Sequence, residues 1–229
     1  MGDRRAYVLV PAYNEGAVIA STLADLRRDF DHVVVVDDGS ADDTATVARA
    51  AGATVVRHPL NRGQGAALKT GLEYVRSRTA AEHCITFDAD GQHLVSDAVA
   101  MLATARDQAI DVVLASRFLG RCEDMPTSRR LLLRSALRFS RVATKLPLTD
   151  THNGLRVLSR QAFERIDLTQ DRMAYATELE AAIARNELSW TEVPTTVRYT
   201  EYSRAKGQHN LNAVNIVFDL AWDRLRSAP

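Results

Sequence analysis

The chain has 229 residues, of which 46% are hydrophobic and 25% charged, and these proportions are ordinary for a globular protein. Its 29 basic and 29 acidic residues give a formal net charge of zero at pH 7, so the overall charge gives no sign of nucleic-acid binding. No apolar run approaches the roughly 18 residues of a membrane span, and neither the cysteines nor the histidines have the spacing of a zinc site. Because Met1 leads almost directly into an apolar run and the cysteines are few, we expect no signal peptide and a reducing, cytoplasmic environment.

Short apolar runs alternate with segments of helical spacing through the first half of the chain. The runs that predict buried strands are 6–10, 32–36, 53–57, 83–87 and 111–116, and the segments that predict helices are 16–28, 42–51, 66–78 and 96–108. This alternation predicts an α/β fold with a mostly parallel sheet flanked by helices. Right-handed crossovers would bring the loops after the strands to one edge of the sheet. Those loops are 11–15, 37–42, 58–65, 88–95 and 116–126.

The second half is less regular, and its elements are predicted with more varied spacing. In order they are a helix at 128–146, a turn at 149–154, a strand at 155–158, a helix at 175–186, a strand near a sheet edge at 190–199, a basic loop at 202–209 and an amphipathic helix at 210–225. No flexible linker, internal repeat or low-complexity segment divides the chain. We therefore expect a single domain over residues 1–229.

Two carboxylates follow the fourth predicted strand, where the apolar run 83–87 ends. Asp88 and Asp90 are two residues apart, and on extended backbone such residues point to the same side. Ligands of open α/β sheets bind beyond the carboxyl ends of the strands. Two carboxylates held so near to each other favour the binding of a cation such as Mg²⁺ or Mn²⁺, which would itself be attached to phosphate oxygens. The alternative is a pair of solvated loop carboxylates that cap the helix near Ser96 and Asp97.

Polar residues also follow the first two predicted strands. The segment 11–15 offers an aromatic face at Tyr13 and acceptors at a helix start, which suit either a binding loop or a plain N-cap. Asp37 and Asp38 follow the second strand, where an acidic residue can bind ribose hydroxyls or the N–H of a base. Either can instead hold a turn at Gly39. Both roles stay open for Asp37, and for Asp38 we favour binding.

A glycine-rich turn precedes the third predicted helix. The segment 63–68 reads Gly-Gln-Gly-Ala-Ala-Leu, lacks a third glycine and follows the third strand, which argues against a dinucleotide site. A simpler prediction is a tight turn that exposes helix N–H groups. Lys69, one turn into that helix, could reach a phosphate or be solvated.

Four segments carry a family resemblance when they are read together. They are 10–15 (Val-Pro-Ala-Tyr-Asn-Glu), 36–40 (Val-Asp-Asp-Gly-Ser), 61–65 (Asn-x-Gly-x-Gly) and 88–93 (Asp-Ala-Asp-Gly-Gln-His). In this order they resemble the inverting, nucleotide-sugar-dependent glycosyltransferases of family 2, which have the Rossmann-like GT-A fold. The segment 150–156 is similar to the Asp-x-x-Ser-Gly-Phe-Arg of the dolichyl-phosphate mannose synthase and polyprenyl-phosphate sugar transferase branch, with Asn153 and Leu155 as departures.

The resemblance implies a hexosyltransferase that uses a UDP- or GDP-linked sugar. The residues it implies for nucleotide-sugar binding are Pro11, Tyr13, Glu15, Asp38, Asp88, Ala89 and Asp90, and the neighbouring candidates that we add are Ala12, Gly65 and Lys69. It further implies a Mg²⁺ or Mn²⁺ ion held by Asp90, with Asp88 and Gln92 beside it. The hexose would pass, with inversion, to a polyprenyl or dolichyl phosphate. The alternative acceptor is a sugar hydroxyl in polysaccharide or glycolipid assembly.

Basic residues outside the acidic loops are candidates for binding phosphate groups. If the chain is a glycosyltransferase, residues 1–120 would bind the nucleotide sugar, and residues 121–229, with the C-terminal amphipathic helix, would face the acceptor. Arg117 lies just past a strand end and is the best single candidate for an acceptor phosphate. The other candidates are Arg130, Arg134, Arg204 and Lys206, the first two within a helical stripe that also contains Arg138, Arg141 and Lys145.

The basic stripe of helix 128–146 has two interpretations. It could lie on an anionic membrane surface or hold a lipid phosphate, or it could be the solvated face of a helix packed on the core. The first interpretation predicts peripheral contact with the inner face of the plasma membrane and leaves room for a small membrane partner protein.

The sequence leaves the general base open. A sugar-hydroxyl acceptor would need a carboxylate to take its proton, and the candidates are Asp150 and Glu178. A polyprenyl phosphate is already anionic and would need no base. Asp150 could instead hold a turn, and Glu178 could lie on a helix surface. The catalytic candidates are Asp90, Arg117 and Asp150.

Two other functions compete with this interpretation. One is a phosphotransferase with Asp88 as the nucleophile, but that class carries its motif after the first strand and with a threonine that is missing here. The other is a non-catalytic nucleotide-sugar-binding subunit, against which the full set of acidic motifs argues.

Overall fold

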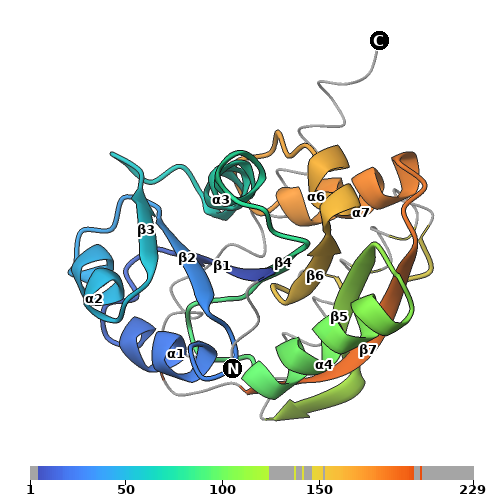
Figure 1. Cartoon of the computed structure of the whole chain (residues 1–229), viewed down its shortest axis with the longest axis horizontal. Helices are drawn as coiled ribbons and strands as arrows, with labels where there is room; N and C mark the ends of the chain where they lie inside the picture. The colour runs from blue at the N-terminus through green and yellow to red at the C-terminus, as the bar shows by residue number, and fades with distance from the viewer. Residues whose placement is uncertain are drawn as a thin grey trace.

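The computed structural model describes residues 5–123, 137, 141, 146–151, 153–198 and 202, with the backbone alone at 122 and 123. Its centre is a seven-stranded sheet in the order β3-β2-β1-β4-β6-β5-β7 (Figure 1). The strands are β1 (Ala6–Ala12), β2 (His32–Asp37), β3 (Thr54–Arg57), β4 (His83–Thr86), β5 (Val112–Glu123), β6 (Arg156–Ser159) and β7 (Trp190–Arg198). Neighbouring strands pair in parallel except at β6, which runs antiparallel to β4 and β5. The prediction of a mostly parallel sheet is confirmed. The predicted strand 190–199 near a sheet edge is confirmed as well, because β7 is the last strand of the sheet.

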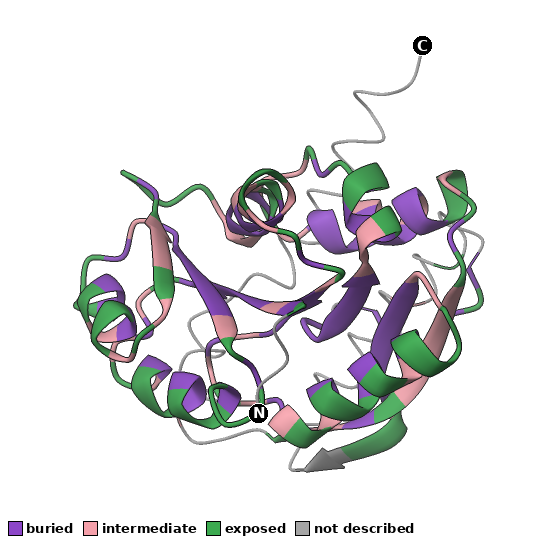
Figure 2. Cartoon of the chain, in the orientation of Figure 1, coloured by how far each residue is buried: buried purple, intermediate pink, exposed green. Residues whose placement is uncertain are grey.

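Helices cover both faces of the sheet (Figure 1). One layer contains α1 (Ile19–Leu26), α2 (Thr44–Ala50) and α4 (Val95–Asp107), and the other contains α3 (Gln64–Arg78), α6 (Arg160–Arg165) and α7 (Tyr175–Arg185). Side chains of β1 alternate between the layers: Leu9 packs with α3, and Val8 and Val10 pack with α1. Figure 2 shows the result, with buried central strands between helices whose outer faces are exposed.

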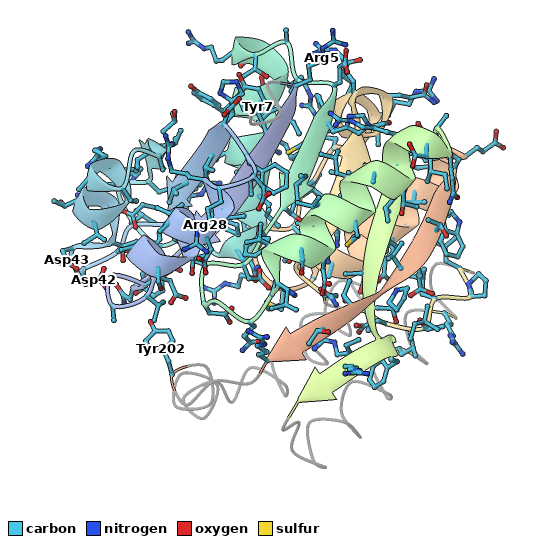
Figure 3. All side chains as sticks on the ribbon, turned by 60° about the horizontal axis from the view of Figure 1, so that its bottom comes forward. Arg5, Tyr7, Arg28, Asp42, Asp43 and Tyr202 are labelled. Carbon is cyan, nitrogen blue, oxygen red and sulfur yellow. The ribbon has the colours of Figure 1, made fainter. Side chains whose placement is uncertain are left out.

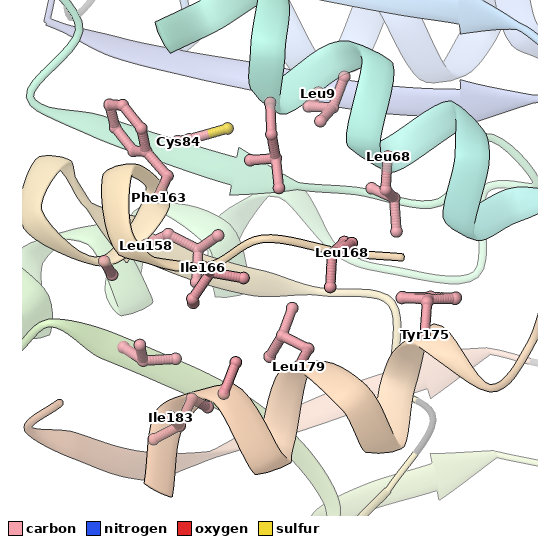
Figure 4. Packing of buried hydrophobic residues seen from close by; sticks show 14 of the residues in the cluster. Leu9, Leu68, Cys84, Leu158, Phe163, Ile166, Leu168, Tyr175, Leu179 and Ile183 are labelled. Atoms are coloured by element: carbon pink, nitrogen blue, oxygen red, sulfur yellow. The ribbon is translucent and has the colours of Figure 1, made fainter. Parts of the chain in front are cut away.

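The layer on the α3 side is tightly packed (Figure 4). Leu9 and Phe163 are both fully buried, and burying a side chain of this size contributes roughly 1.5–3 kcal/mol to stability. Gly71 lets α3 approach β1, because a Cβ at Gly71 would lie 2.0 Å from Leu9 Cδ1. Burial also raises the pKa of the Cys84 thiol to about 12, so this cysteine is chemically inert.

The part of the predicted loop 116–126 that the structure describes, residues 116–123, belongs to a strand instead. β5 continues to Glu123 beside β7, and its register with β7 shifts across residues 117–120, which form a bulge. A Cβ at Gly120 would lie 2.2 Å from the carbonyl oxygen of Thr195, so this glycine permits the two backbones to approach. The bulge interrupts the hydrophobic alternation, and that interruption made the strand look like a loop.

One helix has no counterpart among the predicted elements. α6 directly follows β6, and the side chain of Ser159 accepts the Ala162 N–H as an N-cap (3.2 Å). Its few residues are too short to show a helical period.

The predicted helices 128–146 and 210–225 lie outside the described residues, except for Leu137 and Arg141, which are both helical, and Leu146, which is not. Leu137 packs against the core, and Arg141 Nε donates to the Leu148 carbonyl oxygen (2.6 Å). Within the described part of the chain, no helix combines the length and the apolar character that crossing a membrane requires.

Candidate active site

The loops after β1 and β2 are bound to each other at the carboxyl edge of the sheet. The Asn14 N–H donates to Ser40 Oγ (2.9 Å), and the Glu15 N–H donates to Thr44 Oγ1 (2.8 Å). Asn14 has a φ of 52°, a left-handed conformation that asparagine tolerates better than most residues. The result is a fixed loop in which Tyr13 is 41% exposed and Glu15 is buried.

Three other residues that are predicted to bind the nucleotide sugar belong to β1 and to the loop after β4, and they are buried at this edge of the sheet. Pro11 and Ala12 are the buried last residues of β1. Ala89 is also buried, and its carbonyl oxygen accepts a hydrogen bond from Thr22 Oγ1 (3.0 Å). These residues therefore set the shape of the edge, while the charged side chains beside them supply its chemistry.

Asp38 lies beneath the glycine-rich loop and supports it. Its Oδ1 accepts the Arg62 N–H (3.0 Å) and lies 2.7 Å from His58 Nδ1, and its Oδ2 accepts the Gly63 N–H (2.7 Å). The carboxylate is 2% exposed. The structure thus gives Asp38 a loop-holding role, and the binding role implied by the resemblance stays a prediction.

Asp37 has the turn-holding role that was one of its two predicted roles. Its Oδ1 accepts the Ser40 N–H (3.2 Å), as in an Asx turn, and its Oδ2 lies 3.0 Å from Arg57 Nε. Gly39 has a φ of 71° and packs against the Leu60 backbone, where a Cβ would lie 2.4 Å from the carbonyl carbon.

The glycines at the start of α3, Gly63 and Gly65, make room for the segment that precedes α7. A Cβ at Gly65 would lie 2.0 Å from the Gln170 carbonyl oxygen, and one at Gly63 would lie 2.4 Å from the Asp171 carbonyl oxygen. The Ala66 N–H donates to that same Asp171 oxygen (3.0 Å). The turn therefore does not offer the Ala66 N–H to a ligand, and Gly65 acts in packing.

Asp88 contacts a residue of its own loop and two segments that are distant in the sequence. Its Oδ1 accepts from Gln64 Nε2 (3.1 Å), and its Oδ2 lies 3.2 Å from His93 Nε2. The carboxylate rests on Gly154, where a Cβ would lie 2.0 Å from Oδ2. The side chain still remains 28% exposed. Asp88 is thus held in one orientation with part of its surface open.

The two carboxylates have opposite pKa shifts. Burial raises the pKa of Asp88, but the hydrogen bond and charge of His93, followed by the charges of Arg156 and Arg117, outweigh burial and bring the pKa below its ordinary value. Burial and the neighbouring Asp88 charge raise the pKa of Asp90 to about 6. Among the described residues, the Asp90 side chain accepts one hydrogen bond, from the Gln92 N–H (3.1 Å). Asp90 is therefore the carboxylate whose charge lacks compensation.

Neither aspartate caps α4, which begins after Leu94 without a side-chain cap, so the helix-capping alternative does not hold. Among the described residues, no group of three His, Cys, Asp or Glu side chains forms a metal cage by itself. Mg²⁺ in particular is often bound by one or two carboxylates together with substrate phosphates. The uncompensated Asp90, with Asp88 beside it, fits that kind of site.

Arg117 and Asp150 form a buried ion pair across the β5 bulge. Asp150 Oδ2 accepts from the Arg117 N–H (2.9 Å), from Arg117 Nε (2.8 Å) and from Asn153 Nδ2 (3.2 Å). The two side chains are 6% and 0% exposed. This geometry fixes the plane of the guanidinium and engages Asp150 Oδ2, whereas Asp150 Oδ1 is buried without a hydrogen-bond partner among the described residues.

The turn that carries Asp150 is itself fixed by carboxylates. The Thr149 and Asp150 N–H groups both donate to Glu192 on β7 (3.0 and 3.1 Å to Oε1). Thr151 Oγ1 donates to Glu180 of α7 (2.8 Å). The ion pair therefore rests on a rigid frame.

Two other predicted residues have local partners. Lys69 is 51% exposed and lies 4.0 Å from Asp167 Oδ1, which agrees with its solvated alternative. Glu178 accepts the N–H groups of Thr169 and Gln170 (both 2.9 Å). Glu178 therefore holds the loop before α7 and is not available as a general base.

The predicted basic loop contributes an aromatic residue to the site. Tyr202 O–H donates to Glu15 Oε2 (2.8 Å) and approaches the Asn14 carbonyl oxygen (3.2 Å). Figure 3 shows Tyr202 on the side of the molecule where Asp42 and Asp43 lie. Burial and the Glu15 hydrogen bond raise the pKa of Tyr202, so the phenol stays protonated. The basic candidates Arg130, Arg134, Arg204 and Lys206 lie outside the described residues.

Replacing Gly154 with alanine should displace the Asp88 carboxylate. The new Cβ would occupy the space of both Asp88 oxygens, so we expect a loss of about 1–3 kcal/mol in stability from overpacking and a weaker affinity for the donor. Thermal denaturation and donor titration would measure the two effects. Gly71→Ala is the matched control, because it overpacks Leu9 far from Asp88. Equal effects of both substitutions on donor affinity would contradict the role of Gly154.

Sequence reasoning identified Asp88 but not the residues that hold it. Gln64, His93 and Gly154 all lie within the motifs that carry the family resemblance, so the signal was present. A motif does not show which of its residues touches a different motif.

Comparison with known proteins agrees with this architecture. The glycosyl transferase family 2 model matches residues 7–167. An uncharacterised protein of Methanocaldococcus jannaschii, MJ1222, is 34% identical over 96% of this chain and 92% of its own length. The UDP-N-acetylglucosamine–dolichyl-phosphate N-acetylglucosaminyltransferase of Methanococcus voltae is 29% identical over 96% of each chain.

Among solved structures, glucosyl-3-phosphoglycerate synthase from Mycobacterium tuberculosis, in complex with Mn²⁺, UDP-glucose and phosphoglyceric acid, has a similar fold. Its TM-score is 0.67 at 21% identity, over 93% of this chain and 77% of that one. This likeness confirms the GT-A fold class. With a family model that covers most of the chain and a fold of this class, the protein belongs to glycosyl transferase family 2.

Proposed function

We propose that this glycosyltransferase transfers a hexose from a UDP- or GDP-linked sugar to a polyprenyl phosphate, with inversion and with Mg²⁺ or Mn²⁺. One observation carries the proposal: at this edge of the sheet the Asp88 charge raises the pKa of the uncompensated Asp90, and the fixed guanidinium of Arg117 lowers the pKa of Asp88. A carboxylate whose charge lacks compensation, beside a guanidinium of fixed orientation, suits a metal-bound diphosphate next to an acceptor phosphate.

The donor side would be built from the loops after β1 and β4. Tyr13 offers an exposed aromatic face, and Glu15 and Asp88 offer acceptor oxygens to hydroxyl groups. Asp90, with Asp88 and Gln92 beside it, would hold the divalent ion. When bound, the ion would neutralise the charge that develops on the departing nucleoside diphosphate.

The acceptor side would be organised by Arg117. A guanidinium binds a phosphate through paired N–H donors, and its own orientation is already set by Asp150. A phosphate oxygen is ionised at neutral pH and can attack without a base. Glu178 is occupied by the loop before α7, and Asp150 is fully buried in its ion pair with Arg117, which favours a phosphate over a sugar hydroxyl as the acceptor.

The acceptor class also draws on relatives. The Methanococcus voltae relative is named for a dolichyl-phosphate acceptor, and such lipids reside in membranes. We propose contact with a membrane surface, to which Arg130, Arg134, Arg204 and Lys206 would contribute. Nothing in the described residues favours a small membrane partner protein, and the proposal does not include one.

A donor screen followed by a transfer assay tests the function. UDP-N-acetylglucosamine, UDP-glucose and GDP-mannose, each with Mn²⁺, should be compared by thermal shift, since a ligand at 100 times its Kd stabilises a protein by about 2.7 kcal/mol. We expect one sugar nucleotide to raise the Tm and then to yield a hexosyl polyprenyl phosphate. Binding without any transfer would favour a non-catalytic subunit, and a phosphorylated Asp88 would favour a phosphotransferase.

Substituting Asp150 with asparagine should distinguish positioning from base catalysis. The amide keeps an acceptor for the Arg117 N–H groups, so we expect turnover with polyprenyl phosphate to fall by no more than about 10-fold, whereas loss of a general base costs about 10²–10⁴-fold. Steady-state kinetics over a range of acceptor concentrations would measure it. Glu192→Gln, on the same turn, is the control. A loss above 10²-fold at an unchanged acceptor KM would identify Asp150 as a base.

A further inference from the structure

Tyr202 joins a late segment of the chain to the loop after β1. Its hydroxyl donates to Glu15 Oε2 (2.8 Å) and lies 3.2 Å from the Asn14 carbonyl oxygen. Tyr202 and Glu15 are 187 positions apart in the sequence, and β7 ends at Arg198, shortly before Tyr202. Figure 3 shows the side chain of Tyr202 on the side of the molecule where Asp42 lies. The contact therefore brings a residue of the acceptor-side half of the sequence to the edge that would bind the donor.

The backbone of Glu15 is fixed by its own surroundings. Its N–H donates to Thr44 Oγ1 (2.8 Å), and its carbonyl oxygen accepts the N–H groups of Val18 (3.0 Å) and Ile19 (2.9 Å). These bonds come from the loop after β1 and from α2, and none of them involves Tyr202. The bond from Tyr202 reaches the Glu15 carboxylate instead, so its effect is on the orientation of that side chain.

The surroundings of the Tyr202 hydroxyl are acidic. Burial, the Glu15 hydrogen bond and the charges of Glu15, Asp42 and Asp90 all raise the pKa of Tyr202, so the phenol is a neutral hydrogen-bond donor at pH 7. The Glu15 charge also contributes to the raised pKa of Asp90, which shows that the two carboxylates face the same part of the edge.

An edge rich in acceptors suits the nucleoside of a nucleotide sugar. Ribose hydroxyls and the N–H groups of a base are donors, and a carboxylate such as Glu15 accepts from either. Tyr13, two residues before Glu15, is 41% exposed and offers an aromatic face on which a base can stack. A phosphate group, by contrast, would be repelled here unless a metal ion accompanied it. The nucleoside is therefore the part of the donor that fits beside Glu15.

Holding the Glu15 side chain in advance should favour binding. A free glutamate side chain has three rotatable bonds, and ordering them when a ligand arrives opposes binding. The bond from Tyr202 restricts this motion before the donor is bound. Because a carboxylate has about four acceptor positions, a bond from Tyr202 does not exclude bonds from a ligand.

We propose that Tyr202 is a positioning residue for the sugar donor: its hydroxyl holds the Glu15 carboxylate in the orientation that receives donor groups of the nucleoside. This inference rests on the proposed function for the identity of the ligand. The role differs from that of a simple anchor for the segment after β7, which would affect stability alone. It also differs from that of a competitor, which the nucleoside would have to displace from Glu15.

A double-mutant cycle tests the inference. Tyr202→Phe removes only the hydroxyl, and calorimetry with Mn²⁺ should measure its affinity for UDP or GDP, whichever binds the wild type more tightly. We expect the Kd to rise about 10-fold, because a hydrogen bond to a charged group is lost, and kcat at saturating donor to change by less than about 2-fold. Glu15→Gln should raise the Kd by at least about 10-fold, and the double variant should match Glu15→Gln within about 2-fold. Independent, additive losses would overturn the claim that Tyr202 acts through Glu15.

Fragments of the nucleotide identify the part of the donor that is affected. The corresponding nucleoside monophosphate should lose affinity for Tyr202→Phe by the same factor as the diphosphate. Pyrophosphate with Mn²⁺ should bind both proteins within about 2-fold of each other, because it lacks the nucleoside. An equal loss for pyrophosphate would place the effect at the metal and the diphosphate, and it would overturn the inference.

Tyr74→Phe is the matched control, because Tyr74 is a partly buried tyrosine late in α3 that packs against the core. Its nucleotide Kd should equal that of the wild type. If Tyr202→Phe lowers the Tm and leaves the Kd unchanged, Tyr202 is an anchor, and if it lowers the Kd, Tyr202 is a competitor; either result overturns the inference. A wild type that shows these binding differences but transfers no hexose would overturn only the proposed function.

Discussion

Replacing Asp90 with asparagine should reduce turnover at saturating donor by at least about 10³-fold, because the variant loses the charge that would hold a divalent ion against the diphosphate. Asp90 is suited to binding a divalent ion, because burial and the Asp88 charge raise its pKa to about 6. Its ionised form is therefore poorly compensated when no cation is bound. Turnover measured across a Mn²⁺ titration would show the loss. Asp107→Asn, an exposed carboxylate at the end of α4, is the control. Unchanged turnover at every Mn²⁺ concentration would contradict the metal assignment.

The same substitution should have the opposite effect on the stability of the metal-free protein. The pKa of Asp90 lies above its ordinary value of 3.8, so the stability associated with this group is fully present below pH 3.8 and is lost as the pH rises through about 6. The Asp90→Asn variant does not titrate there. In EDTA we therefore expect it to match the wild type near pH 4 and to be more stable above pH 6, by about 1 kcal/mol after allowance for solvent screening. Equal Tm differences at pH 4.5 and pH 8 would contradict the raised pKa.

Replacing Arg117 with alanine should destabilise the protein by about 3–5 kcal/mol and abolish use of the acceptor. The stability loss arises because Asp150 would remain as a buried carboxylate without its ionic partner. The functional loss arises because the candidate phosphate-binding guanidinium is gone. Denaturant unfolding measures the first effect, and acceptor KM and kcat measure the second. Nucleotide binding by the folded fraction should be nearly unchanged, and an equal loss of donor and acceptor affinity would contradict the acceptor role.

A double substitution separates the two effects of Arg117. Combining Arg117→Ala with Asp150→Asn removes the stranded charge, so part of the stability should return, while acceptor use should stay lost. Arg117→Lys gives a further comparison, because a lysine keeps the charge but cannot make the same paired bonds. Recovery of acceptor use together with stability would show that Arg117 acts only in folding.

The positions of the acidic site residues follow from the sequence, but their orientations and pKa values do not. The spacing of Asp88 and Asp90 placed both at one edge, and the structure agrees, but the contrast in their pKa comes from His93, Arg156 and Arg117. Asp38 lies at the predicted edge as well, yet its oxygens face the loop at 62–63. The sequence therefore locates an acidic residue well, and the direction in which it points depends on contacts with other loops.

By itself the sequence determined the alternation of strands and helices, the polar loops after β1, β2 and β4, and the family resemblance, because hydrophobic period and motif order are local properties of the chain. The tertiary structure alone decided the reversed β6 between β4 and β5, the Arg117–Asp150 pair and the contact of Asp88 with Gly154. Each of these depends on which strands become neighbours. Pairing of distant segments is a property of the whole packed core, and no local period encodes it.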